Sequence, residues 1–143
     1  MNCKIFFLLL LLLLPSLSSA QGKWLAIGTR QEFPLSGTGY ADYYVVFVAG
    51  RTYSIYALGL NNLDTTLTVT DPSGYSNFND DWGGASFPKG SGINFTPMMS
   101  GVSVMRTQAK GGSGEVHLYV GDISVCSASC SSKFYRYPYC RNP

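Results

Sequence analysis

Apolar residues recur at every second position in several short segments after residue 20. Leu67 and Val69 alternate with threonines, and Ile93 and Phe95 alternate with polar residues. No segment in this part of the sequence keeps the apolar period of about 3.6 residues that marks an amphipathic helix. Alternation with a period of two is typical of strands with one buried face, so we expect these four side chains to face a core.

Two other segments, residues 43–50 and 51–59, are apolar at consecutive positions. Runs of this kind are typical of strands that are covered on both faces, so we expect central or doubly covered strands here. In a later segment, which begins at Gly101, Val102 and Val104 alternate with Ser103 and Met105.

His117 is the only histidine of the chain, and it lies between Val116 and Leu118 in another alternating segment. A serine–histidine–aspartate triad would have to use it, but no G-x-S-x-G motif accompanies it. We therefore expect His117 to point away from the core, as an exposed strand residue without a catalytic role.

Turn-forming residues separate these segments, at positions 49–50, 61–62, 71–74, 82–84 and 111–114. Short strands between such turns predict an all-β fold. We expect an antiparallel, jelly-roll-like β-sandwich of about seven or eight strands. Its predicted boundaries are residues 21 and 122.

The first 20 residues have a different character. Lys4 precedes an apolar run from Ile5 to Leu14, and small residues follow up to Ala20. A run of about ten residues is too short for a membrane-spanning helix, which needs roughly 20. The layout predicts a signal peptide over residues 1–20 and a secreted protein, extracellular or periplasmic; an uncleaved anchor is the alternative.

Charge and length narrow the function classes. The chain has 143 residues and a formal net charge of +2. A balance this close to neutral gives no electrostatic reason to expect a nucleic-acid partner. The roughly 120 residues that follow the predicted leader fit one small domain.

A tail rich in serine, tyrosine and cysteine follows the predicted domain, over residues 123–143. Its cysteines are Cys126, Cys130 and Cys140. In an exported protein we expect them to form one disulfide, with the third left free or paired with another chain. Zinc at Cys126 and Cys130 is disfavoured, because their C-x3-C spacing lacks further ligands. The tail's aromatic and cationic residues could bind sugars, membrane interfaces or single-stranded nucleic acid, but we favour their packing on the sandwich.

Half of the chain's eight acidic residues lie in one short window. With a nearby asparagine they provide a candidate calcium ligand set: Asp64, Asp71, Asn79, Asp80 and Asp81. Calcium takes six to eight oxygen ligands, and carboxylates supply the charge. We expect a calcium site if the strand ends that carry these residues converge.

Other interpretations of the same window stay open. Asp71 begins the sequence D-P-S-G, in which an aspartate accepts backbone hydrogen bonds, so turn chemistry is favoured for it. A catalytic pair of Asp80 and Asp81 is the weakest option, because adjacent strand residues point to opposite faces. Trp82 follows in a glycine-rich loop and is a candidate ligand-binding residue.

The order of several short motifs resembles the bacterial pre-peptidase C-terminal domain, a β-sandwich of secreted peptidases. The resemblance covers about residues 36–122. Its motifs are DYY, VFVAGRTYSIYALG, LDTTLTVTDPSG, NDD, INFTP, SG leading VSVMRT, and GSGEVHLYV. It implies a non-catalytic module that assists secretion, folding or substrate attachment. Related collagen-binding sandwiches use calcium. The cysteine-containing tail departs from the family pattern.

We therefore expect a standalone secreted accessory or binding module. Its ligand surface would be the loop Asn77–Gly84. Its partner would be an extracellular protein or polysaccharide, with a secreted peptidase as one candidate. Alternatives are a disulfide-linked structural or surface-assembly protein and, less favoured, a hydrolase. Asn94 begins a glycosylation sequon, although Pro97 after the sequon makes its use less favoured.

Overall fold

The computed structural model of the chain describes residues 22–82 and 89–124. The predicted signal peptide and the cysteines Cys126, Cys130 and Cys140 lie outside these residues, so leader cleavage and disulfide pairing stay predictions. The described residues form nine strands. They are β1 (Lys23–Trp24), β2 (Arg30–Ser36), β3 (Tyr40–Phe47), β4 (Tyr53–Gly59), β5 (Asp64–Thr70), β6 (Ser76–Asn79), β7 (Ser91–Phe95), β8 (Gly101–Gly111) and β9 (Ser113–Asp122).

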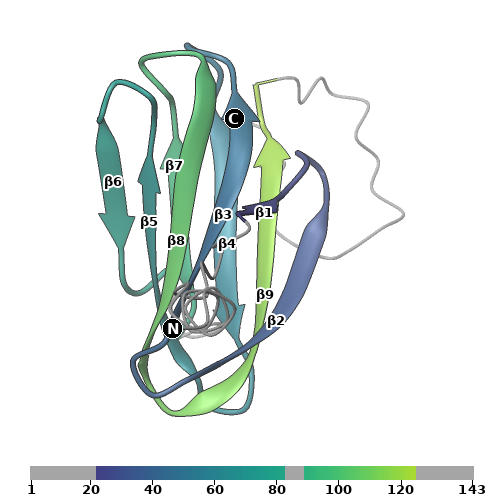
Figure 1. Cartoon of the computed structure of the whole chain (residues 1–143), viewed down its shortest axis with the longest axis vertical. Coiled ribbons are helices and arrows are strands. Elements are labelled where there is room, and N and C mark those ends of the chain that lie inside the picture. The colour runs from purple at the N-terminus through teal and green to yellow at the C-terminus, as the bar shows by residue number, and fades with distance from the viewer. Residues whose placement is uncertain (1–21, 83–88, 125–143) are drawn as a thin grey trace, which may run out of the picture.

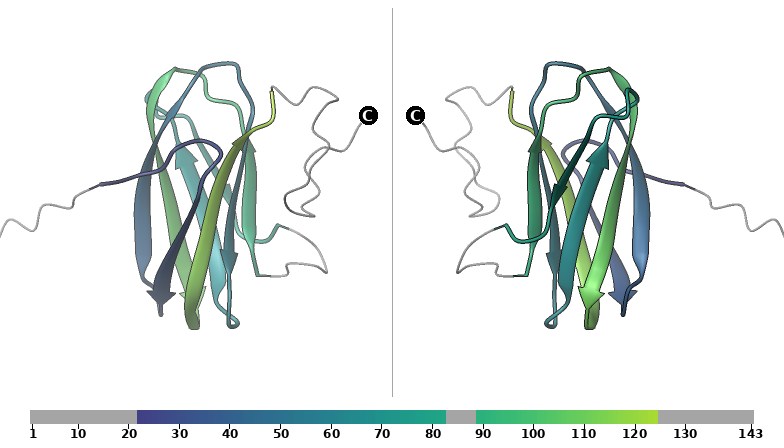
Figure 2. Two further views of the ribbon diagram at one scale, coloured as in Figure 1. Left: turned by 90° about the vertical axis from the view of Figure 1, so that its right-hand side faces the viewer. Right: turned by 90° about the vertical axis from the view of Figure 1, so that its left-hand side faces the viewer.

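The strands form two sheets that face each other (Figures 1 and 2). One has the order β1-β3-β8-β5-β6 and the other β2-β9-β4-β7. The short β1 pairs in parallel with β3, and the other paired strands are antiparallel. The predicted all-β sandwich is confirmed. Over the described residues, the structure contains no helix long and apolar enough to cross a membrane.

The core lies between the sheets and is built from the residues that alternation placed there. Leu67, Val69 and Phe95 are fully buried, and Ile93 is nearly so. Three of its aromatic side chains are Phe47, Tyr53 and Phe95, whose rings pack together. Burying aromatic and branched side chains on the inner faces of both sheets is the main force that holds the sandwich together.

The inner face of β8 carries Ser103 and Met105, which are fully buried, whereas Val102 on the outer face is 46% exposed. The strand register explains why this face of β8 turns inward. Met105 lies opposite both Tyr43 on β3 and Val69 on β5, and the side chains of these two residues fill the core. The expectation for residues 43–50 is corrected: β3 is covered on one face only, because Val45 and Phe47 are buried whereas Val46 on the outer face is 54% exposed. The expectation for residues 51–59 holds, since Tyr53–Ala57 of β4 are all buried.

The sandwich has two ends, and β5 runs from one to the other (Figure 1). At its start lie Asp64 and the end of β6; we call this the Asp80 end. At its finish lie residues 71–75, with residues 48–52 and 97–100 beside them; we call this the Asp71 end. Asp71 follows Asp64 by seven positions along the extended strand, so the two residues lie about 23 Å apart at the usual rise.

Candidate functional site

Three carboxylates meet at the Asp80 end. Asp64 opens β5, and Asp80 and Asp81 directly follow the last residue of β6. Because β5 and β6 are antiparallel neighbours, the start of one strand lies beside the end of the other. One oxygen from each carboxylate lies within 4.8 Å of those of the other two. The predicted convergence is therefore observed for these three residues.

Several side-chain oxygens here are shielded from solvent and have no hydrogen-bond partner among the described residues. They include Oδ1 of Asp64, Oδ1 of Asp80 and Oδ1 of Asn79. A buried acceptor without a partner costs free energy, and more so when it carries charge. These atoms are therefore acceptors with capacity for a cation.

Lys110 on β8 supplies one positive charge to this group. Its Nζ donates a hydrogen bond to Oδ2 of Asp80. That bond, helped by the charges of Asp80, Asp64 and Asp81, raises the pKa of Lys110 above its ordinary value. Three carboxylates against one ammonium still leave two negative charges in excess. The Asp80 end is therefore electrostatically incomplete, in the sense that a further cation would stabilise it.

The donor set fits a hard divalent cation such as calcium, which prefers oxygen ligands and tolerates irregular geometry. Asp64, Asp80 and Asp81 would supply three carboxylates. Two unpaired oxygens, one on Asp64 and one on Asp80, meet the requirement that ligand atoms be free of other partners. Lys110 would compete with the ion for Asp80.

The structure separates Asp71 from this group, whereas Asn79 lies next to it at the end of β6. Asn79 pairs with Leu67, which points into the core, so its side chain starts on the inner side of the sheet. Asp71 lies at the opposite end of β5. The structure therefore brings three carboxylates of the predicted set together and excludes Asp71, while a ligand role for Asn79 stays a prediction.

Asp71 is buried and has partners for both oxygens. Oδ1 accepts bonds from the backbone N–H and hydroxyl of Ser73 and from the backbone N–H of Tyr75. Oδ2 accepts bonds from the N–H groups of Met98, at 2.7 Å, and Met99, at 3.2 Å. Burial alone would raise the pKa of Asp71, but these bonds together lower it below its ordinary value. Turn chemistry, which the sequence favoured, is what the structure shows.

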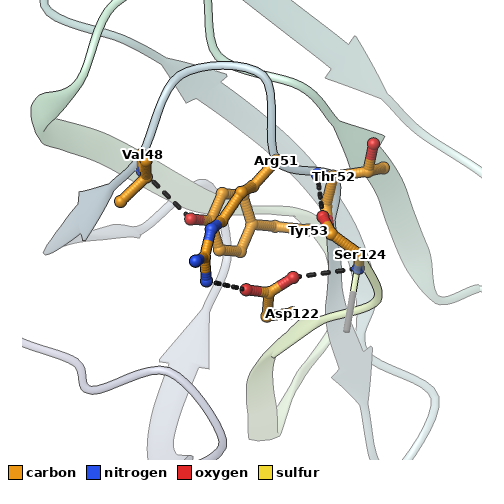
Figure 3. A network of polar contacts seen from close by, with 6 residues as sticks. All are labelled: Val48, Arg51, Thr52, Tyr53, Asp122 and Ser124. Carbon is orange, nitrogen blue, oxygen red and sulfur yellow. Dashed lines mark hydrogen bonds and ion pairs between the residues drawn. The ribbon is translucent and has the colours of Figure 1, made fainter. Parts of the chain in front are cut away.

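A second hydrogen-bonded carboxylate, Asp122, lies at the same end, and the sequence did not identify it (Figure 3). It accepts a 3.1 Å bond from Arg51 and a 2.9 Å bond from the N–H of Ser124. The Ser124 hydroxyl in turn accepts a 2.6 Å bond from the N–H of Thr52. Although burial opposes it, these bonds lower the pKa of Asp122. The network fixes the point where the chain leaves β9.

Trp82, the predicted ligand-binding residue, packs against the outer face of the four-stranded sheet. Its ring centroid lies 4.3 Å from that of Tyr56, and the backbone N–H of Trp82 donates to the carbonyl of Gly90. A Cβ at position 92 would come within 2.5 Å of the indole, so glycine at Gly92 permits this close approach. The indole is partly buried, and a ligand role stays a prediction.

Comparison with known proteins supports the fold. No family model matches the sequence, and no curated protein is similar to it. The structure is similar to a crystal structure of the pre-peptidase C-terminal domain of a collagenase from Bacillus anthracis, with a TM-score of 0.56 and 16% sequence identity. The match covers 70% of this chain and 94% of that domain. The resemblance to pre-peptidase C-terminal domains is confirmed at the level of the fold.

Proposed function

We propose that this protein is a secreted, non-catalytic module that binds an extracellular protein, with calcium organising the Asp80 end. The fold supports the accessory role, because pre-peptidase C-terminal domains accompany peptidases rather than perform their chemistry. The similar domain belongs to a collagenase, an enzyme with a protein substrate, and this favours a protein over a polysaccharide as the partner.

The observation that carries the proposal is the cluster of Asp64, Asp80 and Asp81 with its unpaired, shielded oxygens. These three residues would hold the ion through their carboxylates. Calcium would neutralise their mutual repulsion and fix the end of β6 against the start of β5. It would thereby order the surface that begins at Asp81, which is exposed, and continues to Trp82.

Binding by a pre-ordered surface loses less conformational entropy than binding by a mobile one. Calcium would therefore raise the affinity for the partner by ordering the surface of Asp81 and Trp82, and it need not touch the partner itself. The predicted consequence is a partner affinity that depends on calcium and on the three carboxylates, while the rest of the sandwich keeps its fold.

Co-sedimentation with collagen fibrils, in calcium and in excess EGTA, tests the proposal. We expect the bound fraction to fall in EGTA for the wild type, and to be low under both conditions for Asp81→Asn. Asp42→Asn is the matched control, because Asp42 lies in the same sheet but pairs with Arg106 outside the cluster.

Binding that ignores both calcium and Asp81→Asn would contradict the role of the Asp80 end. Retention on insoluble polysaccharide but not on collagen would replace the protein partner with a carbohydrate. A hydrolytic activity that disappears in Asp80→Asn would overturn the non-catalytic assignment.

A further inference from the structure

A second group of possible metal ligands lies on the outer face of the other sheet. Glu32 on β2 lies directly opposite His117 on β9, and Glu115 precedes His117 by two residues on the same strand. Residues directly opposite, and residues two apart, share one face of a sheet. One oxygen of each glutamate and one imidazole nitrogen therefore lie within 4.8 Å of one another.

The distances within this group suit a small ion. The Nε2 atom of His117 lies 2.7 Å from Oε1 of Glu115 and 3.7 Å from Oε1 of Glu32. Ligands at about 2.0–2.2 Å from a tetrahedral zinc ion are separated by roughly 3–3.6 Å. Small rotations of the two exposed glutamates would bring all three atoms to such positions.

The sheet holds the backbone of all three residues in place. Phe33 beside Glu32, and Val116 and Leu118 on either side of His117, are buried in the core. The side chain of His117 is only 22% exposed. The buried neighbours Val116 and Leu118 thus fix the backbone of His117, and only the side chains of the two glutamates would have to move to bind an ion.

We propose that Glu32, Glu115 and His117 form a transition-metal site for zinc or a similar ion, separate from the calcium cluster. The imidazole nitrogen sets the selectivity, because zinc favours nitrogen with carboxylate ligands, whereas calcium takes oxygen. Three protein ligands leave a fourth position open to solvent. A water molecule, or a carboxylate or imidazole of a bound partner, would complete the coordination.

Arg30 limits the affinity of this site in a predictable way. It forms an ion pair with Glu32, two residues along β2 on the same face. An arriving ion must displace the guanidinium from that carboxylate. Loss of a glutamate and loss of Arg30 should therefore change metal affinity in opposite directions.

The single histidine makes a direct experiment possible. Imidazole ¹H–¹⁵N spectra of the purified protein, recorded during titration with zinc chloride, report on His117 alone. Cysteines are alkylated beforehand so that thiolates do not take up zinc. We expect the imidazole signals to shift saturably in zinc and to stay in place in calcium.

Calorimetric titration with zinc completes the test. His117→Ala and Glu115→Gln should each weaken binding about tenfold or more, and Arg30→Gln should tighten it. Asp81→Asn, at the other metal cluster, should leave zinc binding unchanged. Imidazole signals that do not move in millimolar zinc would overturn the proposal, as would zinc affinity that survives His117→Ala. Weaker binding in Arg30→Gln would refute the competition between the guanidinium and the ion.

Discussion

The two ends of the sandwich use aspartate in opposite ways. At the Asp71 end, Asp71 and Asp122 are enclosed by donors from loops far apart in the sequence, and the pKa of each is lowered. At the Asp80 end, three carboxylates share one lysine, and oxygens of two of them are shielded without a partner among the described residues.

This difference separates structural acids from acids available to a ligand. A carboxylate whose lone pairs are all occupied by protein donors contributes to folding and has no capacity left for a metal. Clustered carboxylates that lack donors destabilise the protein on their own and become favourable only with a cation. The number of acidic residues in a window therefore says less about a metal site than the donors around each one.

The largest expected effect is at Asp71. Asp71→Asn would replace one of its two oxygens with an amide NH₂; if Oδ2 is replaced, that group faces the N–H groups of Met98 and Met99. Donors would then oppose donors at a buried site, so we expect the thermal midpoint to fall by about 10 °C or more. Circular dichroism melts measure it. A midpoint within 2 °C of the wild type would contradict the structural role of Asp71 that distinguishes its end of the sandwich from the Asp80 end.

The two ends should also fail at opposite extremes of pH. Because folding lowers the pKa of Asp71 and Asp122, their contribution is complete above the ordinary value of 3.8 and is lost as pH falls through the lower folded values. The raised pKa of Lys110 makes its contribution complete below 10.5 and lost as pH rises further.

Amide spectra recorded across the pH range follow the two ends separately. We expect the Met98 and Met99 signals to change first in acid, and the signals of residues 80–82 to change first in alkali. Signals that change in the reverse order, or all at the same pH, would contradict the prediction that the two ends lose stability at opposite extremes of pH.

Lys110→Gln should have an intermediate effect. Without calcium it removes the only lysine bonded to the Asp80 cluster among the described residues, so we expect a midpoint lower by about 2–4 °C. With calcium the same variant should bind the ion more tightly, because the ammonium no longer competes for Asp80. Calorimetry with calcium chloride measures this, and weaker binding would argue that Lys110 holds the cluster in its binding geometry.

The smallest effect is expected for Asp81→Asn without calcium. Removing one of three like charges relieves repulsion, so the midpoint should stay the same or rise by about 2 °C. The equivalent change at Asp71 lowers stability strongly. A clear loss of stability in calcium-free Asp81→Asn would mean that this carboxylate has a structural partner.

Local patterns were sufficient for much of the fold. Period-two alternation identified Leu67 and Phe95 as core residues, and the D-P-S-G sequence identified the turn at Asp71. The inner face of β8 was not predictable, because Val102 and Met105 are both apolar. The pairing of β8 with β3 and β5 decides whether Val102 or Met105 faces inward. This pairing forms between strands far apart in the sequence, so the local pattern of β8 does not show it.

The sites show the same limit. The hairpin of β5 and β6 brings Asp64 to Asp80 over a short sequence distance, so their convergence could be expected. Met98 and Met99 reach Asp71 only through the packing of separate loops. Glu115 is close to His117 in the sequence, but the third member of that group, Glu32, comes from a strand near the start of the domain and joins it only through the pairing of β2 with β9.

Thermal unfolding in millimolar calcium and in excess EGTA, for wild type and Asp81→Asn, tests the central claim most directly. A ligand that binds only the folded state raises its stability, by about 2.7 kcal/mol at a hundredfold excess over Kd. We predict that calcium at such an excess raises the wild-type midpoint by more than about 10 °C and leaves that of Asp81→Asn unchanged. Equal wild-type midpoints in calcium and EGTA would contradict a calcium site at the Asp80 end.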